Sequence, residues 1–283
     1  MAKVIACIAS GCHAQEVTSM VDGRGHVEQK EEKYAVDPGG TLTVDADLGS
    51  IRVEPWSRNE VDVSVEKIIS MIDDGRARQE LEEVEVEISQ NRDGVRVDVN
   101  RPGWFKKNRV SVKMRFRVPE TYNLDLKTSG GDIEAGDLKG DINARTAGGD
   151  VEIGIVSEGD VTAGSAGGDV RVRCGGRETD LSTTGGDITV ERAEGGVSAK
   201  TTGGNIEIGD TNGDVDVKTT GGNIEVGRVS GNVTAGTVGG NIEIGPTLGD
   251  VNVKTIGGSI DIDDVGGTVN TSALGGRVTI GSS

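Results

Sequence analysis

A Gly-Gly pair that returns every 18 residues constrains this chain more than any other feature. Each period holds two short stretches in which aliphatic and polar residues alternate, so it predicts two short β-strands joined by glycine turns. One interval, between the second and third pairs, is 19 residues long. The pairs begin at Gly130, Gly148, Gly167, Gly185, Gly203, Gly221, Gly239, Gly257 and Gly275.

The aliphatic residues fall into columns when the periods are aligned. Alternation with a period of two places these columns on one face of a sheet and the residue between them on the other face. The first column is Ile133, Val151, Val170, Ile188, Ile206, Ile224, Ile242, Ile260 and Val278. The second is Ala135, Ile153, Val172, Val190, Ile208, Val226, Ile244, Ile262 and Ile280. The outward column is Glu134, Glu152, Arg171, Thr189, Glu207, Glu225, Glu243, Asp261 and Thr279.

A repeat of this length cannot bury its apolar face alone, whereas stacked copies can. The fold class is therefore all-β: a parallel β-helix or β-roll solenoid with ~18-residue coils. Coils about 4.8 Å apart would make the repeat region roughly 40 Å long. An antiparallel meander, sandwich or barrel gives the same alternation but does not require identical turn residues in every period.

The turn residues also favour direct stacking. Asp132, Asp150, Asp169 and Asp187 are followed at the equivalent places by Asn205, Asn223 and Asn241, whose amides we expect to pair along the stack. In a second row, we expect the hydroxyl groups of successive coils to hydrogen-bond to one another in the same way. This row consists of Thr146, Ser165, Thr183, Thr201, Thr219, Thr237 and Thr255. The Gly-Gly pairs predict corners with positive φ.

The front of the chain differs in composition and spacing. Residues 38–67 alternate with degraded spacing, a polar helix is predicted over residues 73–84, and further strands follow. All six aromatic residues lie before residue 123, and we expect Trp56, Phe116 and Tyr122 to close the apolar end of the solenoid. The predicted domains are a leader-like segment at 1–27, degenerate coils and a β-rich cap at 28–122, and regular repeats at 123–283.

The layout resembles a bacterial family of unknown function labelled putative adhesin. The resemblance rests on "LGSIRVEPWSRNEVDVSVEK", on "RVPETYNLDLKTSGGDIEAGDLKGDINARTAGGDVEI" and on the repeats after them, and covers about residues 37–283. It implies a β-helix and an exported location. It supplies no catalytic motif.

The net charge and the repeat motif limit the classes of partner that this chain is expected to bind. A net charge of −17 argues against nucleic acid and against an anionic membrane as main partners. The acidity either keeps a long β-protein soluble or collects calcium. The phrase "GGNIEI" shares only its Gly-Gly start and nine-residue beat with calcium-binding nonapeptide rolls, because it lacks their third glycine and ligand aspartate. We expect no cofactor or metal site.

The N-terminus, "MAKVIACIASGCHAQEV", is compatible with export. Two processing events fit: cleavage after Ala14, or a lipoprotein-type signal in which Cys12 is acylated and anchors the protein to a membrane. The predicted location is periplasmic, outer-membrane lipoprotein or cell surface. Loss of the leader would leave Cys174 alone or with a lipidated Cys12, so no disulfide framework is expected.

Two surface features are candidate contacts. The first is the outward acidic column at Glu207, Glu225 and Glu243, a solvated face or a strip for cations or a basic partner. Its repulsion could be relieved by lysines at outward positions of the second strand, namely Lys200, Lys218 and Lys254. The second is the group Trp104, Phe105, Lys106 and Lys107, either part of the cap or a contact for a membrane surface or polysaccharide.

No catalytic residues are proposed, because residues 123–283 contain no aromatic residue and no histidine to accompany their many carboxylates. The sequence favours a non-enzymatic exported surface or periplasmic protein that acts as an adhesin or structural spacer, with an unknown surface ligand. One alternative is a scaffold that self-associates through open coil ends. The other is a β-helical carbohydrate-active enzyme.

Overall fold

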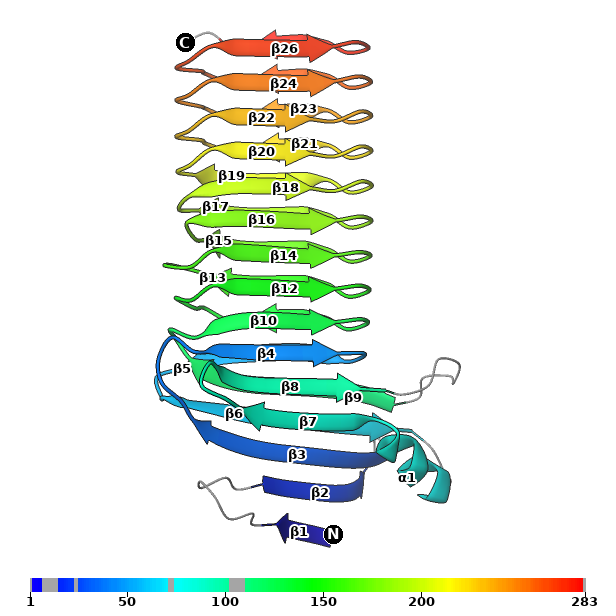
Figure 1. Cartoon of the computed structure of the whole chain (residues 1–283). Coiled ribbons are helices and arrows are strands. Elements are labelled where there is room, and N and C mark those ends of the chain that lie inside the picture. Colours follow the sequence, from blue (N-terminus) through cyan, green and yellow to red (C-terminus); the bar gives the residue numbers. More distant parts are fainter. Residues whose placement is uncertain (1, 7–14, 23–24, 71–73, 102–109, 282–283) are drawn as a thin grey trace. The chain divides into compact units, whose positions relative to one another are not determined.

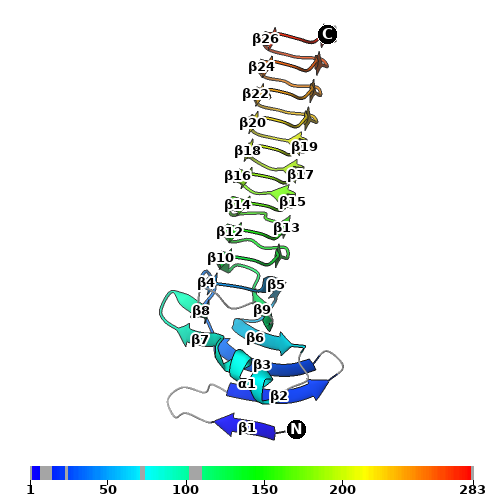
Figure 2. The same cartoon turned by 90° about the vertical axis from the view of Figure 1, so that its right-hand side faces the viewer.

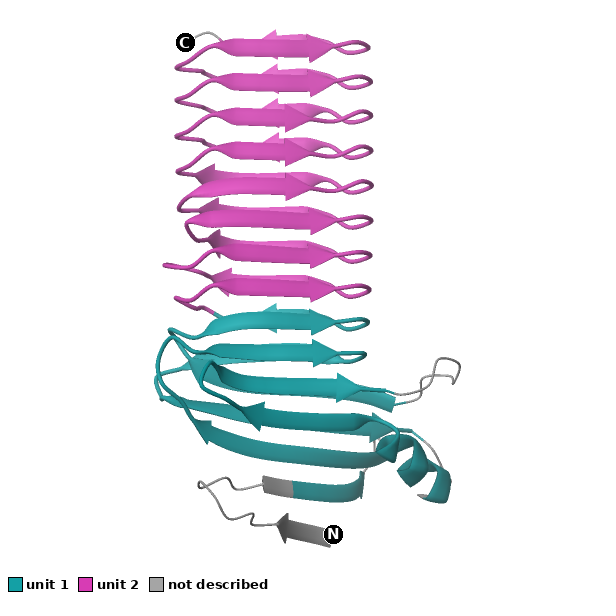
Figure 3. Cartoon of the chain, in the orientation of Figure 1, with its two compact units in different colours: residues 1–136 teal, residues 137–283 magenta. Residues whose placement is uncertain are grey.

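The computed structural model describes residues 2–6, 15–22, 25–70, 74–101 and 110–281. The chain divides into two compact units, Met1–Gly136 and Asp137–Ser283 (Figure 3). Apart from one short helix, every regular element in the described residues is a β-strand. The all-β solenoid predicted from the 18-residue repeat is therefore confirmed.

The second unit is a stack of coils. Each coil contributes one strand to each of two sheets, as Figures 1 and 2 show from perpendicular directions. We call these the even sheet and the odd sheet. The even sheet contains β12 (Ile142–Thr146), β14 (Val161–Ser165), β16 (Glu178–Thr183), β18 (Gly196–Lys200), β20 (Val215–Lys218), β22 (Val233–Gly236), β24 (Val251–Thr255) and β26 (Val269–Ala273). The odd sheet contains β13 (Val151–Ile155), β15 (Val170–Gly175), β17 (Ile188–Ala193), β19 (Ile206–Thr211), β21 (Ile224–Val226), β23 (Ile242–Ile244), β25 (Ile260–Ile262) and β27 (Val278–Ile280).

The strand register follows the sequence repeat. Ile206 lies beside Ile224, and Ile224 lies beside Ile242, each in a parallel pair with the strand of the next coil. These three side chains are 1% exposed. The parallel pairing rules out the antiparallel alternative, and the burial confirms the predicted inward columns.

The Asx column stabilises one corner by a bond different from the one predicted. The backbone N–H of Asn223 donates to Oδ1 of Asn205 at 2.9 Å, and that of Asn241 donates to Oδ1 of Asn223 at 2.8 Å. The expected amide-to-amide ladder is wrong here, because each side-chain oxygen accepts from the main chain of the next coil. At a corner between strands these N–H groups have no ladder partner, so the side chain supplies one.

The threonine row also differs from the prediction. Thr219 Oγ1 donates to the carbonyl oxygen of Gly204 at 2.8 Å and accepts from the N–H of Gly222 at 3.3 Å. The hydroxyls therefore bind glycine backbone groups instead of one another. Thr183, Thr201, Thr237 and Thr255 make the same two bonds.

The glycine pairs are required for close approach and not for positive φ. Among the described residues, positive φ occurs only at Gly25, Gly39, Gly49 and Gly94, so the prediction of positive φ at the pairs is wrong. The second glycine of each pair instead lies directly against the coil before it. A Cβ added to Gly222 would lie 2.0 Å from the carbonyl oxygen of Gly204, which is closer than a carbon and an oxygen that are not bonded can approach.

The two positions of a glycine pair should therefore tolerate a methyl group very differently. We expect Gly222→Ala to lower the free energy of unfolding by about 1–3 kcal/mol, because the coils must separate to admit it. The matched control is Gly221→Ala, where the nearest atom to the new Cβ is 3.4 Å away and the change should be under about 1 kcal/mol. Urea unfolding followed by circular dichroism measures both, and equal losses would contradict the close-approach account.

The first unit combines solenoid coils with an antiparallel excursion. One sheet runs in the order β1 (Ala2–Ala6), β2 (Gln15–Asp22), β3 (Gly25–Ala35), β6 (Glu60–Ile69), β9 (Val110–Pro119), β5 (Ser50–Trp56) and β11 (Ile133–Ala135). The other runs in the order β7 (Glu85–Gln90), β8 (Gly94–Asn100), β4 (Thr41–Ala46) and β10 (Asn123–Thr128). Strands β10 and β11 stack in parallel on β4 and β5, so the residues between β5 and β10 are inserted between two neighbouring coils. This insertion explains the degraded spacing of the front segment.

The aromatic residues of this unit occupy two environments. Phe116 and Tyr122 are 1% and 0% exposed, whereas Trp56 is half-buried. The guanidinium carbons of Arg58 and Arg117 lie over the Trp56 ring, 5.0 and 5.7 Å from its centroid, and the ring Nε1 donates to the carbonyl oxygen of Glu60. Trp56 is thus held by cation–π contacts on the outside of β5 instead of contributing to a buried apolar end.

The predicted helix is observed as α1 (Asp74–Glu82), and a buried lysine holds its C-terminal end. Lys67 Nζ donates to the carbonyl oxygens of Leu81 at 3.0 Å and Val84 at 3.1 Å. It also pairs with Glu28 Oε1 at 2.5 Å. All three ammonium protons therefore have acceptors. Leu81 lies in the last turn of the helix, where carbonyl groups lack partners within the helix itself, and Val84 lies two residues beyond it.

Removing this ammonium group should loosen the helix from the sheet. We expect Lys67→Met to lower the free energy of unfolding of the first unit by about 2–4 kcal/mol, because Glu28 and two carbonyl oxygens lose their donor. Lys33→Met is the control, since Lys33 is 56% exposed and its Nζ lies 3.8 Å from Asp62, and it should change stability by under about 0.5 kcal/mol. Chemical unfolding of both variants tests this, and a harmless Lys67→Met would refute the role of the lysine.

Candidate functional site

The predicted acidic column lies on the outer face of the odd sheet. Glu207 lies directly beside Glu225, and Glu225 directly beside Glu243, with Asp261 in the next coil. All four side chains are exposed. Adjacent parallel strands place these carboxylates about 4.8 Å apart along the stack. The structure thus forms the predicted row of like charges.

The lysines that were expected to relieve this repulsion lie on the other sheet. Lys200 and Lys218 are neighbours on the even sheet, and Lys254 lies on the same outer face. The two strands of one coil belong to different sheets, so their outward side chains point to opposite sides of the unit. Lys218 pairs instead with Asp216 at 2.9 Å. The expected compensation is therefore wrong.

The outer face of the first unit shows how this chain pairs charges elsewhere. Arg52 lies 3.0 Å from Glu54 on its own strand and 2.9 Å from Glu134 on the adjacent strand. Arg52 thus has two carboxylate partners, whereas three glutamates follow one another on the odd sheet. Among the described residues, no group of three or more side chains suited to metal binding is found.

Several predicted contact residues cannot be placed. Cys12 and the group Trp104, Phe105, Lys106 and Lys107 lie outside the described residues. Their proposed roles in lipidation and surface contact stay predictions. Cys174 is buried and carries a free thiol.

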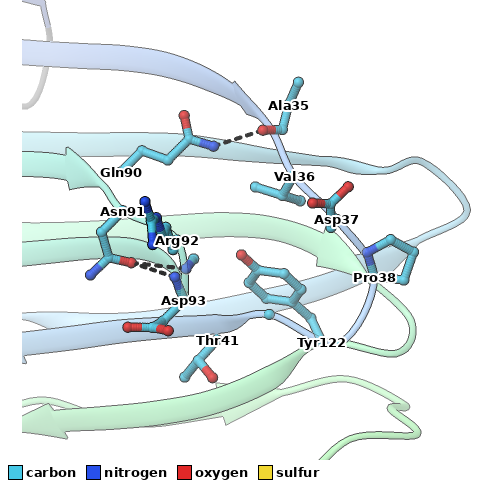
Figure 4. Close-up of a pocket in the computed structure, with 13 residues that line it drawn as sticks. Ala35, Val36, Asp37, Pro38, Thr41, Gln90, Asn91, Arg92, Asp93 and Tyr122 are labelled. Carbon is cyan, nitrogen blue, oxygen red and sulfur yellow. Dashed lines mark hydrogen bonds between the residues drawn. The ribbon is translucent and has the colours of Figure 1, made fainter.

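A pocket that the sequence did not indicate lies in the first unit (Figure 4). It has a volume of about 690 Å³ and forms where three adjacent parallel strands, β8, β4 and β10, begin. The strand starts are aligned, because Thr41 pairs with both Gly94 and Asn123. Its walls are the segment 35–41 and the β7–β8 turn at 90–94.

Hydrogen bonds fix these two walls. Gln90 Nε2 donates to the carbonyl oxygen of Ala35 at 2.7 Å, and the N–H of Thr41 donates to the carbonyl oxygen of Asp93 at 2.7 Å. Asn91 Oδ1 accepts from the backbone N–H groups of Asp93 and Gly94 at 2.8 and 3.0 Å. The turn is therefore preorganised, with Gly94 at a φ of 143° that favours glycine.

Tyr122 forms the floor of the pocket. Its ring fills the space above two glycines, since a Cβ on Gly40 would lie 2.7 Å from the ring and one on Gly94 would lie 2.6 Å from the hydroxyl. Figure 4 shows the hydroxyl directed away from Pro38 and toward the side of Arg92 and Asp93. The hydroxyl oxygen is buried and has no hydrogen-bond partner in the described part of the chain.

Burial raises the pKa of Tyr122, with the nearby Val95 backbone acting in the opposite direction. Its hydroxyl is therefore protonated at neutral pH and can donate as well as accept. Burial also raises the pKa of Tyr34, but that hydroxyl donates to the carboxylate of Glu32. Tyr122 thus differs from Tyr34 in having no acceptor supplied by the described chain.

Turn signals in the sequence mark the walls of this pocket but not its existence. Pro38-Gly39-Gly40 and Asp93-Gly94 are typical turn residues. Their proximity depends on the alignment of strands that are far apart in the chain. Tyr122 was assigned to closing the apolar core, and its burial agrees with that, but its unpartnered hydroxyl could not be foreseen.

These features define a β-solenoid with a polar pocket at the strand starts of the first unit. Residues 41–255 match the family model described as Toastrack DUF4097. The chain belongs to this family, which confirms the resemblance stated from the sequence. No curated protein matches the chain. The described helix is too short and too polar to cross a lipid bilayer.

Several solved structures are similar to this chain, and the first of them shares its fold. A putative adhesin from Parabacteroides merdae is 13% identical, with 89% of this chain and 95% of that chain aligned and a TM-score of 0.50. A putative adhesin from Parabacteroides distasonis is 12% identical, with 89% and 96% aligned and a TM-score of 0.43. A putative lipid-binding protein from Parabacteroides distasonis is 14% identical, with 89% and 96% aligned and a TM-score of 0.37.

The stacked glutamates lead to a stability prediction. We expect Glu225→Gln to raise the free energy of unfolding by about 0.3–1 kcal/mol, because it removes a charge flanked by two like charges. High salt should shrink this gain by screening the repulsion. The control is Glu152→Gln in the same column, where Arg171 lies directly opposite and removal of the charge should give no gain. Urea unfolding at low and high salt measures the free energy of unfolding of both variants. A loss of stability in Glu225→Gln would show that the column is not repulsive.

Proposed function

We propose that this chain is a non-enzymatic, exported β-solenoid surface protein that presents its repetitive faces to a binding partner and serves as a spacer. The main support is the in-register stack of the second unit. A stack of this kind repeats the same outward group in every coil, as Glu207, Glu225 and Glu243 illustrate. A repeated group can engage a repetitive partner at several points at once, and the combined avidity exceeds that of one contact.

The stacked geometry also suits a spacer. Parallel ladders join each coil to the next, so each coil is supported by its neighbours. The coils of the second unit together would span about 38 Å at 4.8 Å for each coil. Family membership and the fold shared with a protein described as a putative adhesin are consistent with a surface role.

The enzyme alternative receives less support from the geometry. A glycosidase holds two carboxylates in different environments, one protonated and one ionised, around a single bond. The glutamates of the odd sheet are exposed and occupy equivalent positions in successive coils. Equivalent solvated carboxylates favour multivalent contact over the division of acid and base roles.

Self-association through a coil end remains the second prediction for a partner. Val278 and Ile280 of β27 are 39% and 48% exposed, whereas Ile260 and Ile262 at the equivalent places of β25 are both 1% exposed.

Export and lipid anchoring can be tested on the full-length chain. We expect the wild-type protein, expressed in a bacterial host, to fractionate with membranes, because acylation of Cys12 would add a lipid anchor. Cys12→Ser should move it to the soluble periplasmic fraction or the medium. The control is Cys174→Ser, which changes a buried thiol and should leave the fractionation unchanged. Retention of the wild-type protein in the cytoplasm would contradict export.

A further inference from the structure

We infer that two copies of this chain associate end to end through the coil formed by β26 and β27. In this dimer β26 pairs with β26 of the other copy, and β27 with β27, both in antiparallel register. The inference rests on the self-association given above as the second prediction for a partner, and it adds the end, the partner and the pairing. In the described residues, β26 and β27 are the outermost strands of the even and odd sheets.

The inward side chains of this outer coil are only partly covered. Val251 of β24 is 0% exposed, whereas Val269, at the equivalent place of β26, is half-buried. Val278 and Ile280 of β27 are exposed, as described above. A partner that covers them must bring apolar groups of its own, spaced along two strands. The same coil of a second copy has this arrangement.

The outer strands also present an edge that is suited to pairing. The N–H of Gly281 donates to the carbonyl oxygen of Ile262 at 2.7 Å, toward β25. Main-chain groups of successive strand residues point to opposite sides, so those of Val278 and Ile280 face away from β25, toward the open edge. Edge strands that avoid pairing usually carry charged residues or proline. Neither β26 nor β27 contains either.

One corner of the outer coil disfavours a further coil stacked in parallel. Asn223 and Asn241 each accept the backbone N–H of the next coil at this corner. Arg277 occupies the equivalent place in the outer coil, and its guanidinium has donors only. The N–H of a coil placed in the same register over Arg277 would therefore lack its acceptor. An antiparallel partner does not repeat that register, so it does not need this acceptor.

Charge determines how the second copy is turned. Arg277 is the only charged residue within 265–281 and lies at the corner between β26 and β27. Asp263 and Asp264 lie at the corner between β25 and β26, at the opposite end of β26 (Figure 1). All three side chains are exposed, and none forms an ion pair with another described residue.

Antiparallel pairing of β26 with β26 brings these opposite charges together. It places Arg277 of one copy next to the corner with Asp263 and Asp264 of the other, twice in each dimer. Pairing of β26 with β27 would instead place the two Arg277 side chains against each other. The charges therefore favour the first arrangement, which is an isologous contact that closes at two copies.

Sedimentation velocity of the full chain, from micromolar to near-millimolar concentration, tests the dimer. We expect a monomer–dimer equilibrium without larger species. Thr271→Lys places an ammonium group on the uncovered side of β26, where the dimer would bury it, so the dissociation constant should rise by about tenfold or more. Thr189→Lys is the matched control on the outer face of β17, and it should dimerise as the wild type does.

A charge exchange tests the orientation. Arg277→Glu should weaken the dimer severalfold, because it places a carboxylate against Asp263 and Asp264 of the other copy. Adding Asp263→Lys and Asp264→Lys to this variant should restore the affinity. Failure of this rescue would contradict the pairing of β26 with β26.

Distances between two copies that each carry one spin label provide a test that does not depend on a disruptive variant. The labels are placed at Glu243 or at Glu207, after replacement of the native cysteines by serine. The dimer predicts separations along the stack of about 24 Å for Glu243 and about 43 Å for Glu207, because the second site lies two coils farther from the contact. Head-to-tail association would give one distance for both sites.

Three outcomes would overturn the inference: a monomer at every concentration, species that grow beyond the dimer, and equal distances from the two label sites. None of them depends on where the protein resides or on what its outer faces bind. Failure of this dimer is therefore distinguishable from failure of export or of the surface role.

Discussion

Direct contact between one coil and the next is the constraint on which the second unit depends. Neighbouring coils lie about 4.8 Å apart, the distance set by the β-ladder. At the glycine corners the backbone of one coil touches the backbone of the coil before it, which leaves no room for a Cβ at Gly222. The Asx oxygen and the threonine hydroxyl of each coil then satisfy main-chain groups at the same corner. Glycine, Asx and threonine recur with the same period because every coil makes the same contact with its neighbour. Glycine permits the close approach, and the Asx and threonine side chains bond to main-chain groups there.

The same stacking determines what the outside of the unit presents. Outward side chains of one strand form a row along the stack, and the two strands of a coil face opposite ways. The stacked glutamates therefore lie on the odd sheet, and Lys200, Lys218 and Lys254 lie on the even sheet. Exposure to water weakens the repulsion between stacked glutamates, so the fold tolerates a row that would be costly inside. The faces become repetitive charged surfaces, which is the property that the proposed function uses.

The first unit departs from this regularity by insertion. The excursion between β5 and β10 separates in sequence two coils that stack in space. It also brings the β7–β8 turn next to the start of β4, which creates a pocket with fixed walls. Gly40 and Gly94 make room for Tyr122 there, and its hydroxyl is left without a partner in the described chain. The irregular coils thus provide a concave site whose walls depend on the insertion.

The sequence predicted what periodicity controls. The solenoid, the inward columns through Ile206 and Ile208 and the stacked glutamates all follow from an 18-residue alternation. It did not predict which atoms bond at the corners, because backbone N–H groups compete with side-chain amides for the same oxygen. It placed the three lysines correctly on the second strand of their coils, but the expected compensation is wrong because that strand belongs to the opposite sheet. The pocket escaped prediction because it depends on the alignment of strands from distant parts of the chain.

Electron–electron distances between spin labels test the stacking most directly. A label at Arg171 would be paired in turn with labels at Glu243, Asp261 and Thr279, after replacement of the native cysteines by serine. These sites are four, five and six coils along one outward column of the odd sheet. The account predicts backbone separations of about 19, 24 and 29 Å, growing by about 4.8 Å with each coil. Distances that fail to lengthen in equal steps would contradict it.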